Sequence, residues 1–238
     1  MPVAKEAIVL AGGFGTRLRS VVSNVPKPLA PVRGRPFLAY VLDLLASNDI
    51  HRVILATGYM GDVIVDSVGD RWLGMEVRYS HEEAPLGTGG AIAQAASYIE
   101  RDAFFVVNGD TYVELDYAAF DMCVDDERAI LGMALAHVPD VTRYGSVNVA
   151  SGRVTGFVEK GAGGAGYINA GVYRLTRSLL KDLPQNHSYS FETDILVPAV
   201  ERCSVVPFMR TAGFIDIGVP EDYQRAQLEL CGKDDRKR

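Results

Sequence analysis

Short apolar runs alternate with amphipathic stretches along the first half of the chain. Residues 8–11, 53–56 and 104–107 are continuously apolar, and residues 76–80 form a further strand-like run. Continuous apolar runs of this length are typical of strands that are covered on both faces, as in a parallel sheet. The stretches between them place apolar residues at helical spacing, for example after Pro36. The pattern predicts an α/β fold, with a Rossmann-like, mixed but mainly parallel sheet flanked by helices.

The pattern changes after residue 116, where a small antiparallel portion is expected. Strands at 145–150 and 153–159 read as a hairpin around Ser151-Gly152. The other elements expected are helices over 62–68, 86–99, 117–125, 177–183, 192–200 and 222–230, and strands over 129–138, 168–175, 205–209 and 214–217. The charged residues 232–238 are expected to fray.

The composition is that of a globular protein without a nucleic-acid partner. A hydrophobic fraction of 48% is ordinary for a folded domain, and a net charge of −6 lacks the basic excess typical of nucleic-acid binding. The three cysteines are few and widely spaced, which indicates reduced thiols and a cytoplasmic location. The chain shows neither a signal-peptide layout nor an apolar run of membrane-spanning length, so no membrane partner is expected.

The first apolar run ends in a glycine-rich turn, Gly12-Gly13-Phe14-Gly15, which is followed by cations. Glycines admit left-handed backbone and leave no Cβ between the backbone N–H groups and a ligand. Arg17 and Arg19 follow at once, and Lys27 is framed by two prolines that restrict its backbone. N–H groups beside cations favour a polyphosphate. A structural strand-to-helix turn is the alternative, since the glycines match neither a dinucleotide fingerprint nor a P-loop.

Two isolated aspartates are candidate metal ligands. Asp110 follows the strand at 104–107, and the carboxyl ends of strands are where ligands bind in open α/β sheets. Asp216 has apolar neighbours on both sides, and an unpaired carboxylate is costly to bury within a strand. Together with phosphate oxygens, the two carboxylates suit Mg²⁺. The alternatives are a turn cap at Asp110 and an exposed strand edge at Asp216.

Further polar residues occur within the strands of the second half. Glu159 and Lys160 follow the apolar part of the run at 153–159, and Asn169 and Gly171 lie within 168–175. Their donors and acceptors suit sugar hydroxyls. An exposed ion pair and a strand bulge are the structural alternatives. The four histidines are scattered, with no nucleophile motif beside them, and are interpreted as structural or surface residues.

These motifs resemble the signature of the sugar-1-phosphate nucleotidyltransferases, also called nucleotide-sugar pyrophosphorylases. The blocks that carry the resemblance occur in the order L-A-G-G-F-G-T-R-L, V-P-K-P, E-E-A-P-L-G-T-G-G-A, N-G-D, Y-G-S-V, F-V-E-K, I-N-A-G-V-Y, F-E-T-D and F-I-D-I-G. The resemblance implies a glycosyltransferase-A-like nucleotidyltransferase fold. Because no linker divides the chain, we predict one domain over 1–238, with a nucleotide-binding half at 1–116 and a sugar-phosphate-binding half at 117–238.

The resemblance also implies a role for each matched residue. The nucleotide would be held by Leu10, Gly12, Gly13, Gly15, Thr16, Glu82, Leu86, Gly87 and Thr88. Arg17 would contact the triphosphate and Lys27 the reacting phosphates, while Asp110 and Asp216 would hold Mg²⁺. The sugar phosphate would be lined by Gly109, Tyr144, Gly145, Glu159, Lys160, Asn169 and Gly171.

The implied reaction is attack of a sugar 1-phosphate oxygen on the α-phosphorus of a nucleoside triphosphate, which expels pyrophosphate. No general base is needed, because the second pKa of a phosphate monoester is about 6. Within the family, the run from residue 11 to 28 is most similar to guanylyltransferases that act on D-glycero-α-D-manno-heptose 1-phosphate. GTP and this sugar phosphate are therefore the expected partners, in a monomer or a dimer. Mannose-1-phosphate guanylyltransferases, uridylyl- or cytidylyltransferases and a catalytically silent nucleotide-sugar sensor are the alternatives.

Overall fold

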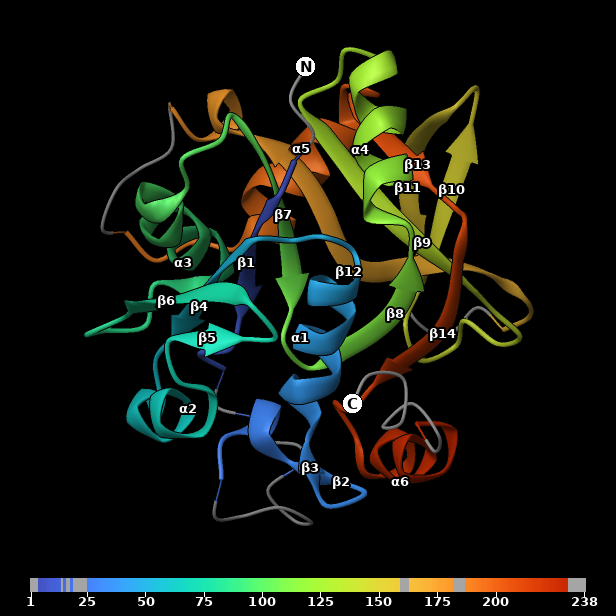
Figure 1. The fold of residues 1–238 in the computed structure, drawn as a ribbon. Helices are drawn as coiled ribbons and strands as arrows, with labels where there is room; N and C mark the ends of the chain where they lie inside the picture. Colours follow the sequence, from blue (N-terminus) through green and yellow to red (C-terminus); the bar gives the residue numbers. More distant parts are fainter. Residues whose placement is uncertain are drawn as a thin grey trace.

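A central sheet of eight strands has the order β13-β9-β12-β7-β1-β4-β6-β5 (Figure 1). The computed structural model describes residues 4–13, 15, 18, 25–158, 163–181 and 187–230. The parallel part consists of the four strands predicted first, which are β1 (Glu6–Leu10), β4 (Arg52–Thr57), β6 (Met75–His81) and β7 (Ala103–Asn108).

Strands from the second half extend the same sheet. β12 (Gly166–Thr176) runs antiparallel to both of its neighbours, β7 and β9 (Leu131–Val138), while β13 (Val205–Phe208) is parallel to β9. At the opposite edge the short β5 (Arg71–Trp72) is antiparallel to β6. The sheet is therefore mixed but mainly parallel, as the sequence predicts.

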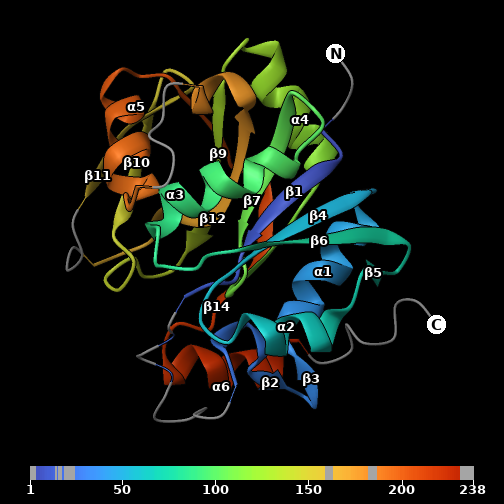
Figure 2. The same ribbon diagram turned by 90° about the vertical axis from the view of Figure 1, so that its left-hand side faces the viewer.

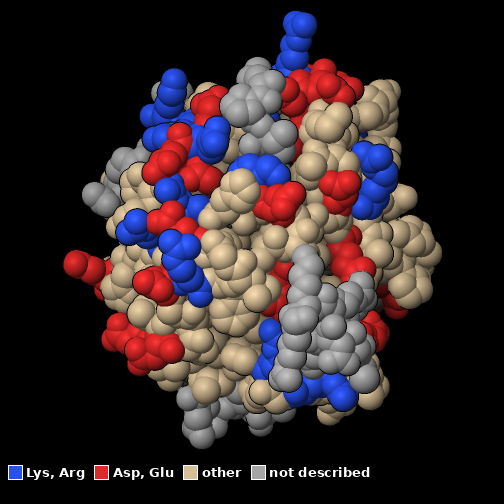
Figure 3. Space-filling model, in the orientation of Figure 1, with Lys and Arg blue, Asp and Glu red and all other residues tan. Residues whose placement is uncertain are grey.

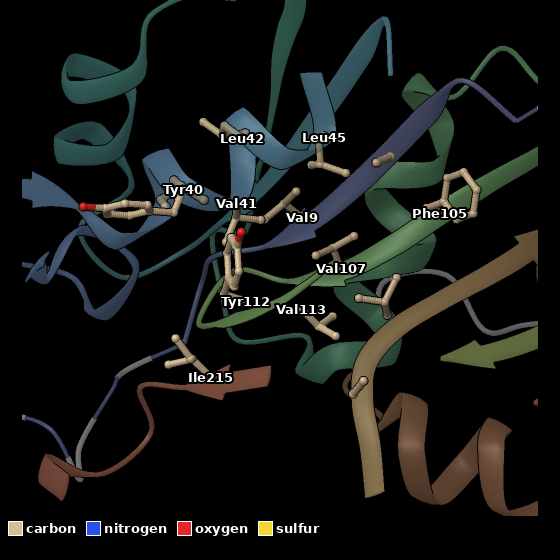
Figure 4. Close-up of a cluster of buried hydrophobic side chains, with 14 of the residues drawn as sticks. Val9, Tyr40, Val41, Leu42, Leu45, Phe105, Val107, Tyr112, Val113 and Ile215 are labelled. Carbon is tan, nitrogen blue, oxygen red and sulfur yellow. The ribbon is translucent and has the colours of Figure 1, made fainter. Parts of the chain in front are cut away.

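Helices cover both faces of the sheet, because alternate strand residues point to opposite sides. Val9 and Phe105 belong to a buried cluster with α1 (Phe37–Ser47) and α4 (Tyr117–Asp126), part of which is drawn in Figure 4. Ile8 and Val106 belong to a second cluster with α3 (Gly87–Ala95) and α5 (Val197–Glu201). Figure 2 shows α3 and α5 on one side of the sheet and α1 on the other. Burial on both faces is why these strands are continuously apolar in the sequence.

Three two-stranded antiparallel sheets add to the central one. β10 (Ser146–Ala150) and β11 (Arg153–Val158) form the predicted hairpin, and β2 (Pro31–Val32) pairs with β3 (Arg35–Pro36). The third sheet pairs β14 (Thr211–Asp216) with β8 (Thr111–Leu115), a strand that the pattern does not predict. Tyr112 and Ile215 are partners in this sheet and both belong to the buried cluster (Figure 4).

The helices differ from the prediction chiefly at their ends. α2 (Gly61–Val68) and α6 (Pro220–Glu229) lie close to the expected positions. The helix expected over 86–99 ends at Ala95 and continues as a 3₁₀ turn at Ala96–Tyr98. A π-helix at Phe191–Leu196 precedes α5, so the helix expected over 192–200 is two elements. The helix expected over 177–183 is a 3₁₀ turn at Arg177–Leu180, and residues 182, 183 and 232–238 lie outside the described residues.

The surface and the helix lengths bear on possible partners. On the face shown in Figure 3, basic and acidic side chains are interspersed. In the part of the chain that the structure describes, no helix is both long and apolar enough to cross a membrane.

Candidate active site

Lys27 lies at the centre of the site, at the start of the 3₁₀ turn Lys27–Leu29. Its ammonium contacts the Asp110 carboxylate and lies 3.9 Å from Oδ1 of Asp216. The Lys27 side chain is 14% exposed, and each aspartate side chain is 34% exposed. Gly15 packs against it: the backbone of Gly15 has a φ of +57°, and a Cβ there would lie 2.7 Å from Cβ of Lys27. Any larger residue at position 15 would strain the turn and displace Lys27.

The pairing of β8 with β14 brings Asp110 and Asp216 together. Asp110 directly precedes β8, Asp216 ends β14, and the N–H of Ile217 donates to the carbonyl of Asp110 at 3.1 Å. Oδ1 of Asp216 accepts a hydrogen bond from the N–H of Gly218 at 2.7 Å. Burial and the neighbouring charge of Asp110 raise the pKa of Asp216, although the ammonium of Lys27 opposes the shift. The two carboxylates therefore face one shared cation.

The two carboxylates also fit a magnesium ion. Mg²⁺ usually binds one or two carboxylates and completes its octahedron with phosphate oxygens and water. Within the described residues, no group of three or more acidic, histidine or cysteine side chains could hold a metal by itself. A pair of carboxylates suits a metal that shares its remaining positions with a phosphorylated substrate.

A first cavity of about 310 Å³ opens beside Lys27, where β1, β4 and β7 end. Of the residues predicted for the nucleotide, those that line it are Leu10, Gly12, Gly13, Glu82, Gly87 and Thr88. Lys27, Asn108 and Asp110 line it as well. Gly15 and Leu86 are not lining residues, since Gly15 supports Lys27 and the N–H of Leu86 donates to Oε2 of Glu82 at 2.9 Å.

Glu82 fixes the loop that precedes α3. Besides the hydrogen bond from Leu86, its Oε1 approaches the glycine-rich turn so closely that a Cβ on Gly12 would lie 3.0 Å away. Burial raises the pKa of Glu82, and the hydrogen bond from Leu86 opposes this shift. Glu82 thus bonds to one of the loops that border the first cavity and packs closely against the other.

A segment from the second half of the chain fastens the start of α3. The N–H of Tyr189 donates to the carbonyl of Leu86 at 3.0 Å, and the N–H of Gly89 donates back to the carbonyl of Tyr189 at 3.0 Å. The N–H of Phe191 donates to Oγ1 of Thr88 at 2.9 Å. The hydroxyl of Thr88 therefore already has a structural partner.

A second cavity of about 540 Å³ meets the first at Asn108, which lines both. Of the residues predicted for the sugar phosphate, those that line it are Tyr144, Gly145, Asn169 and Gly171. Asp216 lines this cavity, whereas Asp110 and Lys27 line the first, so the three charged groups lie where the cavities meet. Gly109 lines neither cavity; its N–H donates to the carbonyl of Leu10 at 2.9 Å and holds the end of β7 against β1.

Asn169 and Gly171 lie in a bulge of β12 and also line the second cavity. The strand bulge that the sequence analysis gave as an alternative is therefore present together with the predicted position at the cavity. The register of β12 against β9 shifts between Asn169 and Tyr173. Nδ2 of Asn169 donates to Oη of Tyr173 at 2.6 Å, and its Oδ1 accepts from the N–H of Gly171 at 3.0 Å. Gly171 has a φ of +68°, and a Cβ there would lie 2.6 Å from Nδ2 of Asn108. Glycine at 171 leaves room for Asn108 between the cavities.

Four predicted residues, Thr16, Arg17, Glu159 and Lys160, lie outside the described residues. The structure adds lining residues that the sequence analysis did not select, among them Asn108, Arg143, Glu192 and Thr193. Asn108, Glu192 and Thr193 belong to the motifs N-G-D and F-E-T-D, and those motifs were the signal that could have found them. No pattern distinguishes Arg143 from a solvated arginine.

Comparisons with known proteins identify the family of this chain. The nucleotidyl transferase family matches residues 6–233. D-glycero-alpha-D-manno-heptose 1-phosphate guanylyltransferase of Aneurinibacillus thermoaerophilus is 40% identical, over 94% of this chain and 98% of its own. Mannose-1-phosphate guanylyltransferase of Mycobacterium tuberculosis is 36% identical, over 94% of this chain and 64% of its own.

A solved structure is similar as well. The crystal structure of HddC from Yersinia pseudotuberculosis complexed with GMP-PN has a TM-score of 0.84 to this chain at 42% identity. The similarity covers 94% of this chain and 98% of that one. The resemblance seen in the motifs is confirmed, and the chain belongs to the nucleotidyl transferase family.

Proposed function

We propose that the protein is a guanylyltransferase that joins GTP to D-glycero-α-D-manno-heptose 1-phosphate, releases pyrophosphate and uses Mg²⁺. The observation that carries the proposal is the meeting of two cavities at Lys27, Asp110 and Asp216, with Asn108 lining both. Transfer between two phosphates needs such a junction, because both anions must be held in reach of each other. The name of the Aneurinibacillus thermoaerophilus relative, which is matched over 98% of its length, supports the choice of GTP and the heptose phosphate.

The nucleophile in this reaction is the sugar's own phosphate oxygen. It is largely ionised at neutral pH, because the second pKa of a phosphate monoester is about 6. The oxygen forms a bond to the α-phosphorus of GTP, and the bond to the leaving pyrophosphate breaks with its electron pair. The protein therefore needs to align two anions and to neutralise the charge that develops between them.

Each part of the site has a task in this proposal. The N–H groups of Gly12 and Gly13 bind the triphosphate, as the N–H groups of glycine-rich turns do. Lys27 presents its ammonium to the reacting phosphates. Asp110 and Asp216 hold Mg²⁺, which when bound neutralises phosphate charge as a Lewis acid.

The second cavity receives the sugar phosphate in the same proposal. The residues assigned to it are Tyr144, Gly145, Glu159, Lys160, Asn169 and Gly171, and Arg17 is assigned to the triphosphate. We place the reaction in the cytoplasm, in a single domain to which both halves of the chain contribute.

Mannose 1-phosphate is the second candidate sugar, because the Mycobacterium tuberculosis relative is 36% identical to this chain. That relative is matched over only 64% of its length, which favours the heptose phosphate. A silent sensor is disfavoured because Lys27, Asp110 and Asp216 are gathered at one point, an arrangement that nucleotide binding alone does not need.

A pyrophosphate-release assay tests the proposal. The purified protein, with Mg²⁺, is given GTP, UTP, CTP or dTTP together with the heptose 1-phosphate or mannose 1-phosphate. We expect GTP with the heptose 1-phosphate to give the highest kcat/KM of all pairs. Faster release with mannose 1-phosphate would favour the second candidate, and tight GTP binding without release from any pair would favour the sensor.

A further inference from the structure

The loop between β9 and β10 is joined to α6 by a buried carboxylate. Oδ2 of Asp222, whose side chain is 4% exposed, accepts hydrogen bonds from Nη2 of Arg143 at 2.7 Å and from Oη of Tyr144 at 3.1 Å. Its Oδ1 lies 3.3 Å from Nη1 of Arg225. A carboxylate buried this deeply is stable only with such partners, so the loop and the helix are held in one arrangement.

Arg143 is the positively charged member of the second cavity. Among the described lining residues it is the only lysine or arginine, and the acidic lining residues are Asp216 and Glu192. A sugar 1-phosphate would bring up to two further negative charges into this cavity, where they would meet the two carboxylates. Besides Lys160 and Mg²⁺, which the proposed function already assigns, Arg143 is the positive charge that the described lining offers to this anion, because Lys27 lines only the first cavity.

Arg143 keeps N–H groups that can meet an anion, although its guanidinium also lies over the ring of Tyr144, 5.4 Å from the ring centroid. Its side chain is 46% exposed, and only Nη2 bonds to Asp222. To the described residues, the other guanidinium N–H groups make no hydrogen bond. The planar guanidinium can therefore keep its carboxylate partner and still offer two parallel donors to phosphate oxygens.

α6 also fixes where Arg143 stands relative to the rest of the site. Nε2 of Gln227 donates to the carbonyl of Pro31 at 2.9 Å, and Pro31 lies two residues after the 3₁₀ turn Lys27–Leu29. Nη2 of Arg225 donates to the carbonyl of Phe214 at 2.8 Å, in the strand that ends in the metal-ligand aspartate. One helix thus sets the distances between three charged groups that come from separate segments.

We propose that Arg143 binds the sugar phosphate, and that Asp222 is the positioning residue that aims its guanidinium into the second cavity. The inference rests on the proposed function and names a substrate contact that the motifs do not contain. Arg143 attracts the phosphate with its positive charge. Asp222 acts only by holding Arg143 and the adjoining loop in place.

The test compares Arg143→Gln, Arg143→Lys and Asp222→Asn in the pyrophosphate-release assay. KM for the heptose 1-phosphate is measured at saturating GTP, and KM for GTP at saturating heptose 1-phosphate. Arg153→Gln is the matched control for charge: its Nη2 bonds to Oε2 of Glu127 at 2.7 Å, in the same half of the chain and away from the cavity lining.

We expect Arg143→Gln to raise KM for the sugar phosphate about ten- to a hundred-fold, the range for a lost hydrogen bond to a charged group. Arg143→Lys should give a smaller rise in KM for the sugar phosphate, because lysine keeps the positive charge but lacks the parallel N–H donors of the guanidinium. In both Arg143 variants, KM for GTP should stay within about two-fold of the wild type. In the Arg153→Gln control, both KM values should stay within about two-fold of the wild type. Equal sugar-phosphate KM values for Arg143→Gln and Arg153→Gln would overturn the proposal.

Asp222→Asn keeps the size and an acceptor, so the loop can stay in place while Arg143 loses its ionic partner. Its matched control is Asp121→Asn, a carboxylate that is 7% exposed and bonds to Nε of Arg174 at 2.8 Å. A rise in sugar-phosphate KM with Asp222→Asn alone supports positioning, and equal values in the two variants exclude it.

The two proposals can fail separately. If the wild-type protein releases no pyrophosphate from any pair, the proposed function fails. Calorimetric titration of the heptose 1-phosphate into wild-type protein and Arg143→Gln then decides the inference without turnover. Weaker binding of the heptose 1-phosphate by Arg143→Gln than by the wild-type protein supports the contact. Equal binding by the two proteins, or no binding by either, refutes it.

Discussion

Replacing Lys27 with methionine should remove most of the turnover and leave the fold in place. Methionine keeps a stem that packs against Gly15 and removes the charge between Asp110 and Asp216. At the 3.9 Å between Nζ and Oδ1 of Asp216, two unit charges interact by about 4 kcal/mol at an effective dielectric constant of about 20. Water offsets much of this loss, because each aspartate side chain is 34% exposed. The free energy of unfolding should therefore fall by only about 1–2 kcal/mol.

Turnover should be affected far more than stability, because the proposed function places the ammonium where phosphate charge develops. The loss of one such group typically lowers kcat by about 10²–10³. The assay is pyrophosphate release at saturating concentrations of both substrates, with urea unfolding as the measure of stability. Lys5→Met is the matched control, since Nζ of Lys5 also lies 3.9 Å from a carboxylate, that of Asp49. A kcat for Lys27→Met within about ten-fold of this control would refute the reasoning.

Three further outcomes follow from the same geometry. Gly15→Ala should lower kcat at least about ten-fold and destabilise the protein by about 1–2 kcal/mol, because Cβ would meet Lys27 in a left-handed turn; thermal unfolding and steady-state kinetics measure both. Chelation of Mg²⁺ should stop pyrophosphate release, and added Mg²⁺ should restore it. Asp216→Asn should raise the Mg²⁺ concentration that gives the half-maximal rate, measured by titration of the metal. Arg174→Met should cost about 3–5 kcal/mol in urea unfolding, because it leaves the Asp121 carboxylate buried without its charged partner, and both KM values should stay unchanged.

The central strands and most helices could be predicted because their burial is local and periodic. The strands at 8–11, 53–56 and 104–107 lie in the middle of the sheet, so both faces must be apolar. β8 could not be predicted in the same way, because its five residues directly follow Asp110 and include Glu114. Its strand conformation depends on pairing with β14, which lies far along the chain.

The candidate site shows the same division between local and distant causes. Lys27, Asp110 and Asp216 were chosen from their immediate neighbours in the sequence, and the structure brings these three together, while their roles stay predictions. Gly109 was chosen from its motif, but its position is determined by the carbonyl of Leu10 on the adjacent strand. Arg143 was not chosen, because its partner is on a helix nearly eighty residues later.

The pairing of β8 with β14 has a consequence for the protein while it is being synthesised. Chains emerge from the ribosome from the N-terminus, and domains fold as their segments become available. The glycine-rich turn, Lys27 and Asp110 emerge well before β14, which carries Asp216 near the end of the described chain. A nascent chain that has folded its parallel strands would still lack one of the two carboxylates that the proposed function assigns to Mg²⁺. If that assignment holds, the reaction could begin only after β14 has been added.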